Sequence, residues 1–417
     1  MSVLAIKGGP RAADSLRVPA WPMLTEEDRQ AVMEVLDSRN WGRLYAGSRA
    51  EAFEKVFAAY HDADFGIAVS NGTVALELAL VAAGIRPGDE VLVPAVTFIA
   101  SASAIVCKGA IPIFVDSDPE TLAMSATAAE AAITPRTRGI IVVYYGGYPP
   151  DMDAFVRLAR GHNLILIEDC AHAQGTAWRG RKAGSFGHFG CFSFQQSKSL
   201  SAGEGGMVIT SDPQLAEEAR LYHNIGRKVG FPGYEHFVLA SNCRLPELSA
   251  ALLLSQLQRL PSQVQERMAN AAILAQGLEE IGGVKMLKKD ERITQRGYYF
   301  LVLRYDRREF ADVPLRPFIA ALQAEGVPCG SGYGMPLYRQ PAFARAYVAE
   351  LLGRAVADVP DYPNLYLPVA ERFCAEEQIT MPHAVLLSGS EGMGMILDAI
   401  AKIKAHAAEL HDIWCAE

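Results

Sequence analysis

The chain has 417 residues, of which 50% are hydrophobic, and its formal net charge at pH 7 is −8. This length predicts two domains, and the large apolar fraction excludes a disordered chain. The sequence contains no basic block, no apolar run of about 18 residues and no signal-peptide core. We therefore expect a cytoplasmic protein that binds neither nucleic acid nor membrane.

The cysteines are odd in number, widely scattered and without a Cys-x-x-Cys spacing. This distribution argues against a disulfide framework and against a zinc ribbon. We expect no metal site, and we expect several of these thiols to be small core residues. The seven positions are Cys107, Cys170, Cys191, Cys243, Cys329, Cys374 and Cys415.

Helical and strand patterns alternate after an irregular arm that is rich in glycine and proline. Strands that recur between helices predict a mainly parallel sheet with helices on both faces. We expect helices at 25–35, 48–60, 74–83, 99–108, 152–162 and 213–223, and strands at 65–69, 90–93, 111–115, 139–144, 164–167 and 206–210.

The C-terminal part has a different pattern, which predicts a smaller α+β domain. It contains long helices at 246–260 and 263–281, a strand at 298–305, a helix at 314–325, a loop at 329–338 and a last helix at 391–407 capped by Ser390. The predicted division is an N-terminal arm at 1–24, a large domain at 25–265 and a small domain at 266–417.

The stretch from 163 to 206 carries the densest chemical signal. A short apolar strand is followed by Glu168 and Asp169, at the end of the strand where open α/β sheets bind ligands. Ser193 and Lys198 come five residues apart, just before a run of glycines. A carboxylate, an amine and donors for a phosphate are what pyridoxal phosphate requires. Each signal alone has an ordinary explanation, as a surface lysine, a helix cap or a turn, so the prediction depends on their combination.

Two further segments follow predicted strands. Gly72 and Thr73 lie where a strand turns into a helix, a place that binds anions well, although an ordinary capped turn explains them equally. Phe98 follows the strand at 90–93. Its local pattern favours a core residue, and in a cofactor site its ring would provide a stacking surface for a pyridine ring.

Six motifs in order resemble the DegT-type sugar aminotransferases, which are fold-type I pyridoxal-phosphate enzymes. The resemblance extends from about residue 15 to the C-terminus. It implies an α/β large domain with a mainly parallel seven-stranded sheet flanked by helices, and a smaller α+β C-terminal domain. The motifs are Ser70-Asn-Gly-Thr-Val-Ala-Leu76, Pro94-Ala-Val-Thr-Phe98, Ile167-Glu-Asp-Cys-Ala-His172, Phe192-Ser-Phe-Gln-Gln-Ser-Lys198, Gly203-Glu-Gly-Gly206 and Ser241-Asn-Cys-Arg244.

The resemblance implies roles at the matching positions. Lys198 would form the Schiff base with pyridoxal phosphate, Asp169 would pair with the pyridine nitrogen, and His172 would lie beside the ring. The remaining cofactor-binding positions would be Gly72, Thr73 and Ser193 at the phosphate, Phe98 stacked on the ring, and Asn242 donated to the phosphate of the neighbouring subunit. A homodimer with shared active sites follows. The roles of Gln174 and Gln196 stay open.

The implied activity is a ping-pong transamination from glutamate or glutamine to a nucleotide-linked keto-sugar or a keto-cyclitol. Tyr144 stands where family members commonly have a histidine, in a region that can line the acceptor side. This departure indicates an acceptor other than a common nucleotide sugar. The segments Phe194-Gln-Gln-Ser-Lys198 and Pro368-Val-Ala-Glu-Arg372, with Pro382-His383, resemble the branch that acts on inososes and related antibiotic precursors.

Two alternatives use the same fold. One is a deoxysugar dehydratase, but those relatives replace the Schiff-base lysine with histidine, so Lys198 argues against it. The other is a non-catalytic regulator, which an intact set of Lys198, Asp169 and Ser193 makes less favourable.

Overall fold

A computed structural model describes residues 3–43, 47–228 and 231–414, so Cys415 lies outside the described residues. Its centre is a seven-stranded sheet in the order β1-β9-β8-β5-β4-β2-β3. β9 alone runs antiparallel to its neighbours, which confirms the predicted mainly parallel sheet. The strands are β1 (Phe65–Val69), β2 (Glu90–Pro94), β3 (Ile111–Val115), β4 (Thr137–Val143), β5 (Ile165–Asp169), β8 (Phe189–Ser193) and β9 (Gly206–Thr210).

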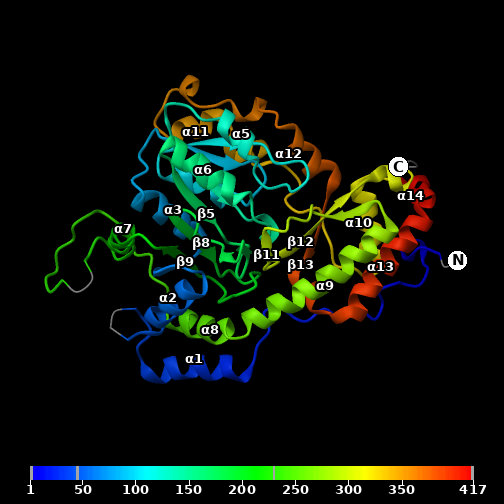
Figure 1. Cartoon of the computed structure of the whole chain (residues 1–417), viewed down its shortest axis with the longest axis horizontal. Coiled ribbons are helices and arrows are strands. Elements are labelled where there is room, and N and C mark those ends of the chain that lie inside the picture. Colours follow the sequence, from blue (N-terminus) through cyan, green and yellow to red (C-terminus); the bar gives the residue numbers. More distant parts are fainter. Residues whose placement is uncertain (1–2, 44–46, 229–230, 415–417) are drawn as a thin grey trace.

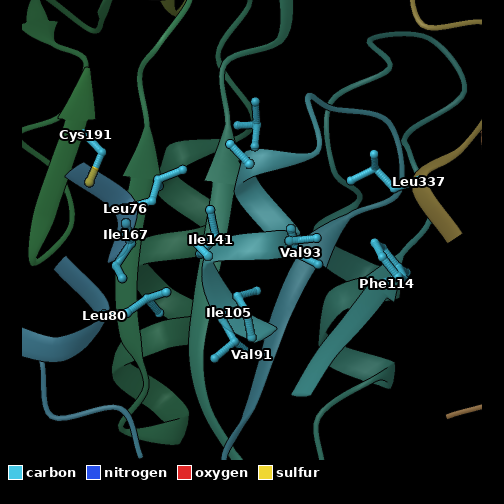
Figure 2. Close-up of a cluster of buried hydrophobic side chains, with 14 of the residues drawn as sticks. Leu76, Leu80, Val91, Val93, Ile105, Phe114, Ile141, Ile167, Cys191 and Leu337 are labelled. Atoms are coloured by element: carbon cyan, nitrogen blue, oxygen red, sulfur yellow. The ribbon is translucent and has the colours of Figure 1, made fainter. Parts of the chain in front are cut away.

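Helices cover both faces of this sheet because successive strand residues point to opposite sides and both sides are apolar. Val91 and Val93 face one side, where they join a cluster with α3 and α4, while Leu92 faces the other. Figure 2 shows Leu76 and Ile105 from these two helices against the strands. The helices that contact the large sheet or lie beside it are α1 (Glu26–Ser38), α2 (Arg49–Tyr60), α3 (Gly72–Ala82), α4 (Ala100–Cys107), α5 (Ala126–Ala131), α6 (Met152–His162), α7 (Pro213–His223) and α8 (Glu247–Leu257).

A second, three-stranded sheet has the order β10-β12-β13 and supports a third apolar cluster. Its strands are β10 (Val284–Met286), β12 (Phe300–Tyr305) and β13 (Gln378–Pro382), and its helices are α9 (Leu260–Ile281), α10 (Leu315–Ala324), α13 (Gly389–Ala405) and α14 (Ala407–Trp414). The 22-residue α9 passes from one sheet to the other, since Val264 belongs to the large-sheet core and Leu278 to the small-sheet core (Figure 1).

The segment between α10 and β13 returns to the large sheet. Tyr338, Phe343 and Tyr362 pack their rings around Phe114 of β3. This segment includes α11 (Arg345–Leu351) and α12 (Pro368–Arg372), which lie over the large sheet in Figure 1. The predicted domain boundary at 265/266 falls inside α9, and the division into domains stays a prediction.

A third small sheet joins the two parts in the order β11-β6-β7, with β6 at Ala177–Trp178, β7 at Arg181–Lys182 and β11 at Ile293–Gln295. Thr25 and Asp28 form a reciprocal capping box at the start of α1, the first predicted helix. The predicted cap Ser390 is wrong, since α13 already begins at Gly389. Among the described residues, every helix is too short or too polar to cross a membrane.

Candidate functional site

A cavity of about 700 Å³ lies at the carboxyl ends of the parallel strands. Asp169 ends β5, Ser193 ends β8, and Gly72 begins the helix after β1. Parallel strands place their carboxyl ends at one edge of the sheet, so residues far apart in sequence meet there. The cavity is lined by every predicted site residue except Asn242, namely Gly72, Thr73, Phe98, Asp169, His172, Ser193 and Lys198.

Lys198 lies in the loop after β8 and reaches into this cavity. Its side chain is almost fully buried, and its Nζ lies 3.8 Å from the centre of the Tyr299 ring. Burial lowers the pKa of the Lys198 amine to about 8, and the negative charge of Asp169 opposes that shift. An amine with this pKa is partly neutral near physiological pH, as a nucleophile or proton acceptor must be.

Asp169 is a buried carboxylate at the floor of the cavity. It accepts hydrogen bonds from Ser101 Oγ at 2.7 Å and from the backbone N–H of Ala171 at 3.2 Å. Burial raises the pKa of this carboxyl, and both hydrogen bonds oppose that rise. Within the described ranges, no basic nitrogen lies within the 4.0 Å of a salt bridge to it. Asp169 is therefore arranged to receive a cationic group from a ligand.

His172 forms the wall next to Asp169 and is neutral. Its ring stacks on Tyr299 with centroids 4.2 Å apart, and its Nδ1 accepts the backbone N–H of Gly146 at 3.4 Å. Burial holds the pKa of His172 well below its ordinary value, and the nearby Lys198 charge lowers it further. A neutral imidazole here can accept or donate a hydrogen bond without adding charge to the cavity.

An anion cradle lies where α3 begins. Asn71 caps this helix by accepting the N–H of Val74 at 2.9 Å, which leaves the first amides, at Gly72 and Thr73, without intrahelical partners. A Cβ at Gly72 would lie 2.7 Å from Cβ of Ser193, so only glycine lets Ser193 approach this closely. Helix N-termini with free amides bind phosphate groups well.

Phe98 is 54% exposed, and its ring lies 6.3 Å from that of Tyr333. The expectation that Phe98 is a core residue is wrong, because the β2 strand ends at Pro94 and the chain then turns outward along the cavity wall. Its ring is free to stack on a ligand.

Two residues with open roles lie outside the cavity. Gln174 is fully buried and donates to the carbonyl of Ser193 at 2.8 Å, so it fixes the backbone of a cavity residue without lining the cavity itself. Gln196 is exposed, and its backbone N–H binds the carbonyl of Gly203 at 2.9 Å.

Tyr144 also faces away from the cavity. It is fully buried and donates its hydroxyl to Glu168 Oε2 at 2.5 Å. The expectation that this position lines the acceptor side is wrong, since strand alternation turns Tyr144 toward the core on the other face of the sheet.

Asn242 is exposed in this single chain. Its backbone pairs with Asn224, and its Oδ1 accepts the N–H of Arg244 at 3.3 Å. Its role toward a neighbouring subunit stays a prediction.

Sequence reasoning missed the tyrosines of the site. Tyr299, next to β12, and Tyr333, in the glycine-rich loop after α10, both line the cavity. The only sequence signal was the aromatic run at 298–300, which looked like part of a strand. Ser101 on α4, which bonds Asp169, carried no signal at all.

Comparisons with known proteins agree with this arrangement. Residues 22–386 match the family described as the DegT/DnrJ/EryC1/StrS aminotransferase family. The chain is 39% identical over 430 residues to the L-glutamine:2-deoxy-scyllo-inosose aminotransferase of Streptomyces fradiae, covering 98% of this chain and 99% of that protein. It is 37% identical over 402 residues to a Streptomyces kanamyceticus protein named for L-glutamine:3-amino-2,3-dideoxy-scyllo-inosose aminotransfer, with 94% of each chain covered.

The fold agrees as well. A solved aminotransferase from Psychrobacter cryohalolentis is 32% identical, with a TM-score of 0.84, and the match covers 94% of this chain and all of that one (100%). The sheet order, the cavity at the strand ends and these matches lead to one conclusion: the chain belongs to the DegT/DnrJ/EryC1/StrS aminotransferase family.

Proposed function

We propose that this aminotransferase binds pyridoxal phosphate in the cavity that contains Lys198. The observation that carries the proposal is that a lysine amine and a buried carboxylate, which has no ion-pair partner among the described residues, face one cavity. The anion cradle at Gly72 and Ser193 fits a phosphate, Asp169 fits a protonated ring nitrogen, and the exposed ring of Phe98 fits a flat aromatic group. When bound, pyridoxal phosphate supplies an aldehyde that bonds to amines and a ring that withdraws electrons from the substrate carbon.

Each residue then has a defined task. Asp169 stays ionised against the cationic ring nitrogen and fixes the orientation of the ring, supported by Ser101. Lys198 Nζ would hold the cofactor through its aldehyde. The same Nζ, once free, would accept the proton from the substrate carbon. The burial of Lys198 keeps this amine partly neutral, as proton transfer requires.

We propose a keto-cyclitol of the inosose type as the acceptor and L-glutamine as the donor. The names of the two relatives support this choice. The cavity supports it too: among the described residues that line it, Lys198 is the sole lysine or arginine. A nucleotide-linked sugar carries a diphosphate, which proteins usually bind with such residues or with helix amides. A neutral polyhydroxylated ring requires hydrogen-bonding groups only.

We further propose a homodimer in which Asn242 completes the phosphate site of the partner. The exposed position of Asn242, outside the cavity of its own chain, agrees with this role.

The test is a panel of inososes and nucleotide-linked keto-sugars, each offered with L-glutamine or L-glutamate and analysed by mass spectrometry for the aminated product. We expect amination of an inosose with L-glutamine and none by a Lys198→Ala variant. Product from nucleotide-linked sugars alone would overturn the acceptor, and full activity of Lys198→Ala would overturn the whole assignment.

A further inference from the structure

The loop that carries Lys198 leaves its sheet at Ser193 and closes on itself through backbone hydrogen bonds. The N–H of Lys198 donates to Gln195 O at 2.8 Å, and that of Ala202 donates to Phe194 O at 2.9 Å. These bonds satisfy the backbone N–H groups of Lys198 and Ala202 within the loop itself. The carbonyls of Ser197 and Lys198 instead accept hydrogen bonds from side chains that lie far away in sequence.

Two rings hold these carbonyls. The indole Nε1 of Trp21 donates to the carbonyl of Lys198 at 2.9 Å. The Nε2 of His383 bonds the carbonyl of Ser197 at 3.2 Å. Burial lowers the pKa of His383 to about 3, so the ring is neutral and its Nε2 carries the proton for this bond. The rings of Trp21 and His383 meet edge to face, with centroids 4.3 Å apart, so the two donors support each other.

The chain on both sides of Trp21 is itself anchored. The buried carboxylate of Glu325 accepts the N–H groups of Ala5 at 2.8 Å and Ala12 at 2.9 Å, and Lys402 pairs with it at 2.9 Å. After Trp21, Arg259 binds the carbonyl of Met23 at 3.1 Å. The N-terminal arm is therefore held firmly enough to position what it contacts.

We propose that Trp21 is a positioning residue for the reaction, which fixes the backbone of Lys198 from the N-terminal arm. This role rests on the proposed function, in which Lys198 supplies the reacting amine. Trp21 and His383 also line a second cavity of about 1190 Å³ that is open to solvent. Water can therefore replace a lost indole N–H at little cost in stability, but water does not hold the loop in one place.

The experiment compares Trp21→Phe, which keeps a ring but removes the donor, with a matched control. Trp41 also donates its indole N–H to a backbone carbonyl, that of Leu36 at 3.3 Å, but it is 54% exposed and lines neither of the two cavities. In Trp21→Phe we expect kcat to fall roughly three- to tenfold with KM nearly unchanged, the range expected for one hydrogen bond. Trp41→Phe should change neither.

Hydrogen exchange of the cofactor-free protein supplies a readout that does not depend on turnover. The amides of Gln196, Lys198 and Ala202 report on the loop because each donates within it. We expect roughly three- to tenfold faster exchange there in Trp21→Phe than in the wild type or in Trp41→Phe. Exchange and kcat both within about twofold of the wild type would overturn the role of Trp21.

A second pair of variants decides the matter if Trp21→Phe does not fold. His383→Leu removes the other donor and should loosen the same amides, whereas His383→Gln, whose amide nitrogen can replace Nε2, should restore their protection. Unchanged loop exchange in His383→Leu would overturn the proposal. Activity that survives in Lys198→Ala would instead overturn the proposed function, so the two failures are distinguishable.

Discussion

Lys198 Nζ lies 3.8 Å from the centre of the Tyr299 ring, so the reacting amine rests on an aromatic face. The same ring stacks on His172 at 4.2 Å, and its hydroxyl bonds Ser197 Oγ at 2.7 Å. Tyr299 comes from the C-terminal part of the chain, directly before β12, whereas Lys198 follows β8. The amine that follows a strand of the seven-stranded sheet is therefore held by a ring that precedes a strand of the three-stranded sheet β10-β12-β13.

Replacing Tyr299 with leucine should lower kcat by roughly 10- to 30-fold, because the Lys198 amine loses the aromatic face that fixes its position, a loss of about 2 kcal/mol. Tyr299→Phe keeps the ring and should lose about fivefold or less, since only the hydroxyl bond is removed. Steady-state kinetics on both variants measure the difference.

The matched control is Tyr60→Leu, which removes a ring lying 4.9 Å from Nζ of another lysine, Lys182, outside the site. This variant should retain the kcat of the wild type. Equal activity of Tyr299→Leu and Tyr299→Phe would show that the aromatic face does not seat the amine.

The Lys198 amine should react with an acylating reagent in the cofactor-free protein with a midpoint near pH 8. Burial lowers its pKa to about 8, and only the neutral amine reacts, so the rate rises through this pH and not near the ordinary value of about 10.4. Competitive labelling across pH, followed by peptide mass spectrometry, gives the midpoint.

Asp169→Asn should lower the same midpoint further. The Asp169 charge raises the pKa of Lys198 against the effect of burial, so its removal leaves burial unopposed. Asp153→Asn, on the outer helix α6, serves as the control and should leave the midpoint in place. A midpoint that rises in Asp169→Asn would contradict the assigned electrostatics.

Gly72→Ala should weaken binding of pyridoxal phosphate roughly tenfold or more. The added Cβ would lie 2.7 Å from Cβ of Ser193, so the cradle must widen. Gly161→Ala is the control, because Gly161 also lies in a helix, α6, and a Cβ added there would have nothing within 4 Å. That variant should gain up to ~1 kcal/mol of stability and bind normally. Titration of the cofactor-free protein, followed by absorbance, compares the two, and equal affinity would remove Ser193 and Gly72 from the phosphate site.

Tyr144→Phe should lower the free energy of unfolding by ~1–3 kcal/mol without changing cofactor affinity. The variant leaves the buried Glu168 without its hydroxyl donor, although backbone amides at Gly184, Phe186 and Gly187 still bind it. Tyr148→Phe removes a hydroxyl bond to a neutral carbonyl, that of Lys288, and should cost less. Denaturant unfolding measures both, and weakened cofactor binding in Tyr144→Phe would place this residue in the site after all.

Mixed dimers test whether Asn242 acts across a subunit boundary. Lys198→Ala should be inactive and Asn242→Asp weakly active when each is alone, and unfolding and refolding them together should restore about a quarter of the wild-type activity through random assortment. In a mixed dimer, one site combines an intact Lys198 with an intact Asn242 of the partner. No recovery, in a preparation shown by native mass spectrometry to contain mixed dimers, would mean that Asn242 acts within its own chain.

The sequence predicted the parallel part of the fold well because its signals are local. The apolar runs of β1 to β5 depend on neighbouring residues only. The positions of Asp169, Ser193 and Lys198 followed from strand ends and from the family resemblance, and all three line one cavity. β8 was missed as a strand because Gly184, Gly187 and Gly190 follow each other at intervals of three residues, which gives the segment before and within β8 the pattern of a loop.

The contacts that complete the site could not be predicted because they depend on tertiary folding. Tyr299 and Trp21 reach Lys198 across about 100 and 180 positions of the chain, distances over which local patterns carry no information. Phe98 was misjudged for the same reason, since an aromatic residue beside a strand has the same local pattern in a core and at a cavity wall.

The hydrogen bonds between Glu325 and the N-terminal arm have a practical consequence for handling the protein. Because this carboxylate is completely buried and takes its donors from residues 5 and 12, trimming the first dozen residues would leave it facing Lys402 alone. A shortened protein that lacks this segment would therefore have weaker packing of the helices on the three-stranded sheet. Because Trp21 is held by the same arm, the hydrogen bond to the carbonyl of Lys198, about 180 positions later in the chain, would also be weakened.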